Sequence, residues 1–136
     1  MALGNLVLDE TGQVTGLRVL SVDASGAKVE VSLQLTGTIR GVAETTIWTY
    51  NTLTRPDGSI YGWGEGIMTT QDGDVITLIG HGSGKTPPPG GTTNFRTMLH
   101  PHSGSAKYAD LNGTALAGEY DVAPDGSAVN KCWEWK

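Results

Sequence analysis

The sequence predicts an all-β fold, a single antiparallel up-and-down β-barrel of about eight or nine strands that occupies residues 1–136. Short runs rich in valine, isoleucine, threonine and aromatic residues alternate apolar with polar side chains, and no segment sustains a helical period. Asp-Gly, Asn-Gly and Ser-Gly pairs separate these runs as turn signals. Glycine contributes 20 of the 136 residues and only 17% are charged, which indicates a folded chain with many turns.

The expected strands cover residues 14–22, 28–39, 42–54, 59–70, 75–85, 94–100, 107–111, 116–122 and 127–135, of which the segment 107–111 is the weakest. The proline triplet at 87–89 interrupts the pattern, and because proline cannot donate to a strand ladder, we expect a loop there, at a mouth of the barrel. Pro-Asp-Gly-Ser occurs at 56–59 and 124–127 and predicts two hairpins with three-residue turns. The second hairpin would place Glu119 opposite Lys131.

The turn at 71–74, Gln-Asp-Gly-Asp, sets the expected alignment of the two strands beside it. A two-residue turn would pair Thr70 with Val75. The alternate glycines of 62–66 and those of 80–84 would then lie on opposite faces of the sheet, each set covered by large side chains of a neighbouring strand. Rings over cross-strand glycines are typical of strongly curved sheets, which supports closure of the barrel.

Large apolar side chains occupy both faces of the central strands. Trp48 and Tyr50 would lie opposite glycines of the next strand, whereas Ile47 and Ile67 would occupy the other face. A solitary barrel needs only one apolar face, so we expect the second face to pack against another copy of the chain in a homodimer or homotrimer. The sequence leaves open which of the two faces lines the interior.

Charge and composition exclude several classes of function. The net charge is −5 without a run of lysine or arginine, so we expect no nucleic-acid partner. The segment MALGNLVLDE lacks the basic region of a signal peptide, and no apolar run approaches the roughly 20 residues of a membrane span. A single cysteine, Cys132, excludes an internal disulfide and suits a reducing compartment. We therefore expect a soluble cytoplasmic protein with no membrane partner.

Two motifs suggest a cofactor or a metal and fail on their spacing. GHGSGKT at 80–86 is similar to a phosphate-binding loop, but its first glycine comes one residue late and prolines follow where a helix should begin. His100 and His102 could share one face of a strand as metal ligands, but Ala106 and Lys107 stand where a third ligand would be expected. A third ligand could still come from a distant residue such as His81 or Glu65. We expect neither a cofactor nor a metal.

The candidate catalytic residues are Glu65 and His81. A carboxylate beside the rings of Tyr61 and Trp63 could be desolvated, which suits a general acid or base. If this face is the outer one, Glu65 points to water while the two rings cover Gly82 and Gly84. His81 would line the interior if the other face is inside. The candidate ligand-binding residues are aromatic or basic side chains of the central and late strands, namely Trp48, Tyr50, Tyr61, Trp63, Arg96, Tyr120 and Trp133.

Three segments carry a resemblance to known proteins: YGWGEGIMTTQDGDVITLIGHGSGK, FRTML and KYADLNGTALAGEYDVAPDGSAVNKCWEWK. Roughly residues 45–136 resemble small uncharacterised bacterial proteins that are similar to the allene oxide cyclase barrel, a calycin-like relative of dirigent proteins. The resemblance implies a barrel that binds hydrophobic, polyketide-like molecules, steers cyclisation by shape without a cofactor, and assembles as dimers or trimers. No catalytic residue of that family aligns with a position of this chain.

Two hypotheses of function follow, and a third remains open. The chain could be a cofactor-independent cyclase or isomerase acting on a polyketide- or lipid-like substrate. It could instead be a non-catalytic barrel that binds a small hydrophobic molecule. A structural barrel filled by its own side chains is the third reading. The content of the interior distinguishes the three.

Overall fold

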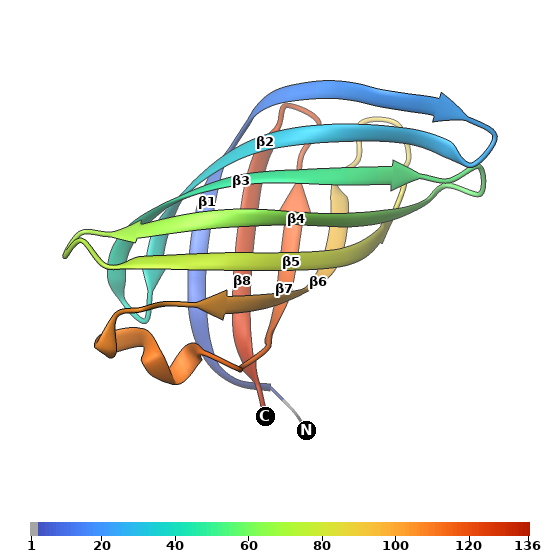
Figure 1. Cartoon of the computed structure of the whole chain (residues 1–136). Helices are drawn as coiled ribbons and strands as arrows, with labels where there is room; N and C mark the ends of the chain where they lie inside the picture. The colour runs from blue at the N-terminus through green and yellow to red at the C-terminus, as the bar shows by residue number, and fades with distance from the viewer. Residues whose placement is uncertain (1–2) are drawn as a thin grey trace.

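The computed structural model describes residues 3–136 and shows a closed antiparallel β-barrel (Figure 1). Its strands are β1 (Leu3–Asp23), β2 (Gly26–Ile39), β3 (Val42–Thr54), β4 (Ser59–Thr70), β5 (Val75–Lys85), β6 (Thr93–His102), β7 (Leu116–Val122) and β8 (Ser127–Trp135). Each strand pairs with the next along the chain, and β8 pairs with β1 to close the ring. The predicted up-and-down barrel is confirmed, with eight strands. Residues 1 and 2 of the predicted domain lie outside the described part.

The strand predicted at 107–111 is wrong, because these residues belong to a 3-10 helix, η1 (Ala106–Leu111). Tyr108 and Leu111 are buried and lie three residues apart, which is one turn of a 3-10 helix. Arg40 anchors η1 through two hydrogen bonds of 3.1 and 2.5 Å to Asp110. The helix thus covers the end of the barrel at which both termini lie (Figure 1). No helix within residues 3–136 is long and apolar enough to cross a membrane.

The first strand begins well before the predicted residue 14. Val7 and Leu8 are both buried, because the pairing with β8 shifts between Leu6 and Leu8. A bulge of this kind turns consecutive side chains to one side and breaks the alternation from which a strand is predicted. Glu10 also points inward, so the usual polar-outside pattern is absent there.

The turn between β4 and β5 has three residues, so the predicted two-residue turn is wrong. Val75 pairs with Thr69 and not with Thr70. Thr70 accepts from the N–H of Gly73 and donates its own N–H to Asp74, both at 2.9 Å. Gly73 has a φ of +87°, which is the left-handed position of a type I turn with a bulge. Asp72-Gly73 thus forms the same turn as the two Pro-Asp-Gly-Ser segments.

The two Pro-Asp-Gly-Ser hairpins are confirmed. Gly58 and Gly126 occupy their left-handed positions with φ of +86° and +85°. In the second hairpin Glu119 pairs with Lys131 as predicted.

A one-residue change in the turn reverses the faces of β5. Gly62 pairs with Gly82, and Gly64 pairs with Gly80, so the glycines of β4 and β5 share the inner face. The prediction that they lie on opposite faces is therefore wrong. Every side chain of β5 changes sides with them, since successive residues of a strand face opposite ways.

Trp48 covers the inner glycines, as the predicted pairing of Trp48 with Gly66 requires. A Cβ atom added to Gly66 would lie 2.7 Å from the Trp48 ring, and one added to Gly80 would lie 3.3 Å from it. The predicted pairing of Tyr50 with Gly64 is confirmed as well. The face that carries Trp48 and Tyr50 is therefore the interior.

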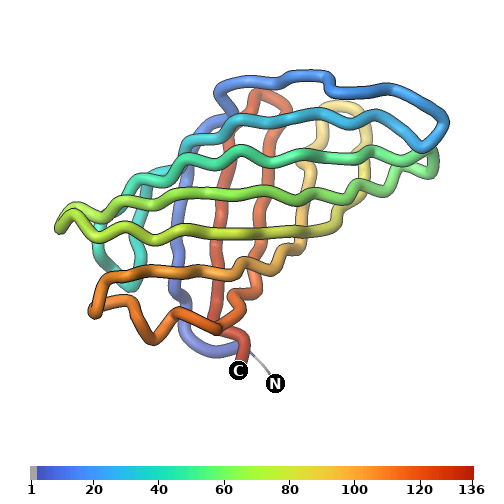
Figure 2. Tube along the Cα trace, viewed as in Figure 1, coloured from blue at the N-terminus to red at the C-terminus, as the bar shows by residue number. Residues whose placement is uncertain are grey.

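The trace in Figure 2 shows the strands of the front wall, β3 to β5, crossing those of the back wall, β1, β7 and β8, at a steep angle. Strands of closed barrels tilt by roughly 35–45° from the axis, so opposite walls cross in this way. Apolar side chains pack between the walls, among them Leu33, Leu35, Met68, Ile76, Leu78, Leu99 and Leu116.

Candidate functional site

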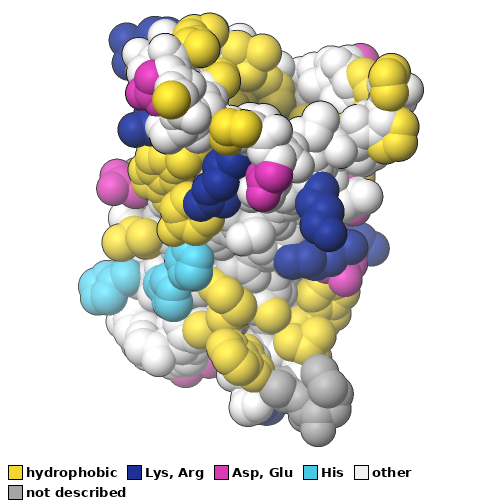
Figure 3. Space-filling view, turned by 90° about the vertical axis from the view of Figure 1, so that its right-hand side faces the viewer, with side chains coloured by type: hydrophobic (Ala, Val, Ile, Leu, Met, Phe, Trp, Pro, Cys, Tyr) yellow, Lys and Arg dark blue, Asp and Glu magenta, His cyan; other side chains and the backbone are white. Residues whose placement is uncertain are grey.

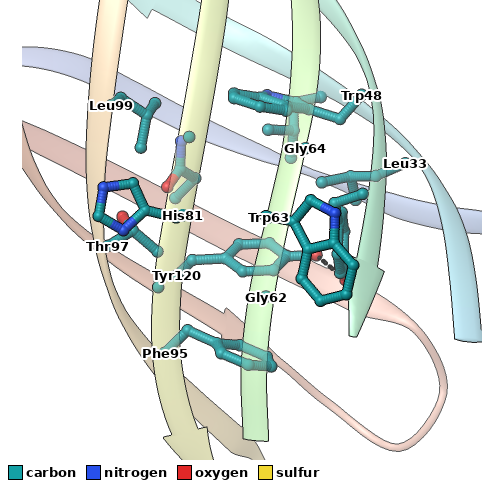
Figure 4. A pocket seen from close by; sticks show the side chains of 15 residues that line it. Leu33, Trp48, Gly62, Trp63, Gly64, His81, Phe95, Thr97, Leu99 and Tyr120 are labelled. Carbon is teal, nitrogen blue, oxygen red and sulfur yellow. Dashed lines mark hydrogen bonds between the residues drawn. The ribbon is translucent and has the colours of Figure 1, made fainter. Parts of the chain in front are cut away.

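The interior contains a cavity of about 70 Å³ between the front and back walls (Figure 4). On β4 and β5 its wall is formed by Gly62, Gly64, Gly80 and Gly82, which leave space because they carry no side chain. The remaining wall is apolar and aromatic, with Asn130 and Thr97 as its polar side chains, and its larger members are Leu33, Leu35, Trp48, Tyr50, Phe95, Leu99 and Tyr120.

A pair of tyrosines closes one end of the cavity. The hydroxyl groups of Tyr50 and Tyr120 form a hydrogen bond of 2.8 Å, drawn in Figure 4. Tyr50 lies on β3 and Tyr120 on β7, which face each other across the eight-stranded ring, so the bond spans the barrel. Phe95 stacks on Tyr120 with ring centres 5.8 Å apart. Burial raises the pKa of both phenols, which keeps them protonated.

An acid pair lies beyond the other end of the cavity. Asn130, Glu10, Gly37 and Glu44 are successive partners across β8, β1, β2 and β3 and form one row on the inner face. Gly37 has no side chain, so the carboxyl groups of Glu10 and Glu44 approach each other across it. Both are buried, with 1% and 4% of their surface exposed. Asn130 belongs to this row and also lines the cavity.

Hydrogen bonds tie the acid pair to its neighbours. Thr46 Oγ1 lies 3.0 Å from Glu10 Oε2 and 2.5 Å from Glu44 Oε2, and Asn130 Nδ2 donates to Glu10 Oε1 at 2.9 Å. A threonine hydroxyl carries one hydrogen, so two such contacts require a second proton on one of the carboxyl groups. Burial, followed by the hydrogen bond and the charge of Glu44, raises the pKa of Glu10 from 4.5 to about 8. At neutral pH Glu10 therefore holds that proton.

Two buried polar atoms around the cavity and the acid pair have no hydrogen-bond partner: Glu44 Oε1 and Thr97 Oγ1. Cys132 Sγ lies 3.8 Å from Asn130 Oδ1, and burial raises the pKa of its thiol to about 12. A neutral, buried thiol is a core side chain and not a nucleophile. The unpartnered carboxylate oxygen is the feature that distinguishes this site.

The structure divides the predicted site residues between the inside and the outside of the barrel. Trp48, Tyr50 and Tyr120 surround the cavity. Glu65 and His81 are exposed on the outer face, and the His81 ring stacks on His100 at 5.9 Å. Imidazole rings lie beside exposed hydrophobic side chains on this face (Figure 3).

Tyr61 and Trp63 also point outward. Their rings stack on each other with centres 5.5 Å apart, and the ammonium group of Lys28 lies 5.8 Å from the Trp63 ring. Trp63 and His81 alternate along β4 and β5 with the glycines that face the cavity, so they adjoin it. Their rings pack on the outer face of the barrel, against Tyr61 and His100.

A second hollow, of about 450 Å³, lies on the outer face of β5 to β8. His81, Arg96 and Trp133 border it, together with Met98 and Ala117. Arg96 is exposed and forms an ion pair of 3.6 Å with Asp121. The predicted residues therefore do not form one site, and Glu65, Arg96 and Tyr120 lie apart from one another. Within residues 3–136 no group of three or more potential metal-binding side chains comes together.

The sequence analysis missed Glu10, Glu44, Thr46 and Asn130. Strand alternation could have found part of the set, because Glu44 and Thr46 share one face of β3 with Trp48. Glu10 could not be found in this way, because the bulges of β1 interrupt the alternation that would show which side chains of this strand point inward.

No protein family model matches this chain, and no curated protein matches its sequence. Solved structures share this fold, among them the three that follow. A protein of unknown function from Clostridium acetobutylicum has a TM-score of 0.85 at 15% identity, covering 97% of this chain and 98% of its own. A conserved protein of unknown function from Rhodopseudomonas palustris has a TM-score of 0.81 at 16% identity, covering 98% and 99%. A β-barrel-like protein from Acinetobacter baumannii has a TM-score of 0.79 at 14% identity, covering 97% and 96%. At these identities the likeness is one of fold, a small β-barrel shared with proteins of unknown function.

Proposed function

We propose that this barrel binds a small hydrophobic molecule, or the apolar end of a larger one, in the cavity between Trp48 and Tyr120. The observation that carries the proposal is the cavity itself, an aromatic and apolar space left open by glycines inside an otherwise packed barrel. Apolar pockets with a few polar groups are the usual sites of small ligands.

The volume limits what the cavity can enclose. Its roughly 70 Å³ is about half of an engineered 150 Å³ cavity that takes up benzene, and well below the roughly 300–1,000 Å³ of pockets for drug-sized ligands. A polyketide- or lipid-like ligand would therefore place one end in the barrel.

A catalytic form of the proposal is a cofactor-free cyclisation or isomerisation, in line with the resemblance to allene oxide cyclase and dirigent barrels. Such a reaction needs the substrate held in a productive shape and an acid or base within reach. Glu65 and His81 stay predictions for this role, and their outward position restricts them to a substrate on the outer face. Binding in the cavity consequently ranks ahead of catalysis.

We also propose that the chain forms a homodimer or homotrimer through the outer face of β3 to β5. Ile47, Ile67 and Ile79 are exposed there by 56%, 48% and 61%. Large exposed apolar side chains on neighbouring strands are typical of association surfaces. Replacing Ile47 and Ile67 with threonine should yield a monomer by light scattering. An unchanged mass, or a monomeric wild type, would reject this face as the contact.

Xenon uptake tests the cavity, because xenon enters dry apolar cavities without needing a polar contact. Under xenon pressure the Trp48 indole signal should shift in NMR spectra, while signals of the outer tryptophans should not. Gly80→Ala narrows the cavity, since its Cβ would lie 3.3 Å from Trp48 and 3.5 Å from Leu99, and should weaken the shift. Thr69→Ala, on the outer face of β4, is the matched control. Absence of any xenon response would reject the binding function.

Native mass spectrometry of protein purified from its own host is the complementary experiment. A retained small molecule, lost in Gly80→Ala and kept in Thr69→Ala, would identify the ligand.

A further inference from the structure

We propose that His81 and His100 form a site on the outer face of β5 and β6 for a divalent metal ion that prefers nitrogen ligands, such as Zn²⁺ or Ni²⁺. The site is separate from the cavity and does not depend on the proposed function. Three observations carry the inference: the distance between the two imidazole rings, the exposure of both rings, and the charged groups on the same face.

β5 and β6 place the two imidazole rings side by side. His81 pairs with Met98 and His100 pairs with Ile79, so the two histidines are diagonal neighbours on adjacent strands. Both side chains are exposed, and their ring centres lie 5.9 Å apart with an angle of 21° between the planes. Histidine side chains accordingly gather on the surface shown in Figure 3. The sequence pointed to His100 with His102, whereas the structure brings the His81 ring to His100.

The spacing of the two rings is close to that of two ligands of one metal ion. An imidazole nitrogen binds Zn²⁺ at about 2.0–2.1 Å, which puts the ring centre about 3.2 Å from the ion. Two such rings at a tetrahedral angle have centres about 5.2 Å apart, so the observed 5.9 Å has to shorten by about 0.7 Å. Exposed side chains make such an adjustment by small rotations about their own bonds, and the strands need not move.

Two imidazoles define the class of ion. Imidazole nitrogen suits Zn²⁺, Ni²⁺ and Cu²⁺, whereas Mg²⁺ and Ca²⁺ prefer oxygen ligands. Within residues 3–136 no third histidine, cysteine or carboxylate joins the pair to make a larger group. Water therefore fills the remaining coordination positions, as it does at metal sites with an open position.

The charged groups on this face favour a cation. Glu65 on β4 pairs with Ile79, which pairs with His100, so the Glu65 carboxylate belongs to the same row of the outer face. Glu65 is exposed and takes part in none of the ion pairs found within residues 3–136. Arg96, on the same face of β6, is paired with Asp121 at 3.6 Å. An incoming metal ion therefore meets a carboxylate that has no cationic partner.

Calorimetric titration of the tag-free chain with Zn²⁺ and with Mg²⁺ tests the site. The wild type should bind a single Zn²⁺ ion per chain and no Mg²⁺. His81→Ala and His100→Ala each leave one imidazole and should lower the Zn²⁺ affinity at least about tenfold. His102→Ala is the matched control, because His102 is exposed two residues further along β6 and lies outside the pair. It should leave the affinity unchanged.

Ni²⁺ locates the site without any substitution, because this paramagnetic ion broadens the NMR signals of nearby groups. The methyl signals of Ile79 and Met98, the strand partners of the two histidines, should broaden at a lower Ni²⁺ concentration than that of Ile47 on β3. Equal broadening of all three signals would place the ion elsewhere and overturn the inference.

The calorimetry has its own contradicting outcomes. Absence of saturable Zn²⁺ binding by the wild type would overturn the inference, and so would equal losses in the three alanine variants. Loss of binding in His100→Ala and His102→Ala, with binding retained in His81→Ala, would assign the ion to the His-Pro-His segment instead. Xenon uptake by the cavity should be the same with and without Zn²⁺, so failure of the metal site leaves the proposed binding function standing.

Discussion

The barrel interior contains two neighbouring layers of side chains, an acid layer and an aromatic layer, and they are packed differently. β3 contributes to both, with Glu44 and Thr46 to the acid layer and Trp48 and Tyr50 to the aromatic layer. The acid layer is held by directed hydrogen bonds of 2.5 to 3.0 Å. The aromatic layer is held by ring packing over glycines and retains a cavity.

The comparison shows where a small barrel can accommodate a ligand. Hydrogen bonds fix the positions of the acid-layer side chains. In the aromatic layer the rings do not fill all the space beside the glycines of β4 and β5, and a cavity remains. The two layers meet at Asn130, which lines the cavity and donates a hydrogen bond to Glu10. Each of the following predictions changes one layer and leaves the other in place.

Removing the Trp48 ring should destabilise the aromatic layer. Trp48→Ala should lower the free energy of unfolding by about 3–5 kcal/mol, because it removes a buried ring and enlarges the cavity. Urea denaturation followed by circular dichroism measures the loss. Thr49→Ala, the next residue along β3 and exposed on the outer face, should change it by less than about 0.5 kcal/mol. Similar losses in both variants would mean that the ring does not support the barrel.

A change of pH should act on the acid layer alone. The pKa of Glu10 rises from 4.5 to about 8 on folding, so its stabilising contribution is complete below about 4.5 and is lost as the pH rises through about 8. The free energy of unfolding should fall by up to about 1.4 kcal/mol per pH unit in that window. Denaturation curves at pH 5, 6, 7 and 8 measure the slope.

Glu10→Gln should flatten this dependence, because glutamine resembles the protonated acid, and Asp9→Asn should not. The pKa values of Asp57 and Asp125 are lowered by hydrogen bonds from the serines that follow them, so both titrate below the window. A slope that persists in Glu10→Gln would assign the proton to another group.

The turn that sets the register of β5 should be sensitive to a side chain at Gly73. Gly73→Ala places a methyl group on a residue with φ of +87° and should lower the free energy of unfolding by about 1–2 kcal/mol. Nothing lies within 4 Å of the new Cβ, so the loss measures backbone strain alone. Thermal unfolding compared with Asp72→Ala, one residue earlier, provides the check, and a stabilised Gly73→Ala would contradict the assigned turn.

The smallest expected effect concerns the tyrosine pair. Tyr120→Phe removes one hydrogen bond and should lower the free energy of unfolding by about 0.5–1.5 kcal/mol. The same change should speed entry of xenon, since the bond crosses the barrel beside the cavity. Xenon exchange followed by NMR in Tyr120→Phe, Tyr50→Phe and the double variant measures the coupling. Unchanged entry rates would show that ligands do not pass between the tyrosines.

Local signals in the sequence were sufficient for the strands and for most turns. Alternation located β2 to β5 and the Pro-Asp-Gly-Ser turns closely, because both depend on neighbouring residues. Alternation failed at η1, where Tyr108 and Leu111 match a helical turn, and in β1, where bulges place Val7 and Leu8 on the same side. Both failures arise where contacts with distant segments override the local pattern.

The candidate site was predicted only in its aromatic half. Trp48, Tyr50 and Tyr120 were expected to bind a ligand and do line the cavity. Trp48 and Tyr50 could be identified from strand pairing, because both lie opposite glycines of β4. Glu65 was chosen because it lies beside rings in the sequence, yet those rings and the carboxylate all point outward. The register of one turn decided between inside and outside for every residue of β5.

The sequence by itself determined that the chain forms a closed antiparallel barrel with aromatic side chains over glycines, because alternation and turn chemistry act between near neighbours. Only the tertiary structure decided which residues meet inside. Glu10, Glu44 and Asn130 come from three strands far apart in the chain. Closure of the ring between β1 and β8 brings them into one row, and burial in that row raises the pKa of Glu10.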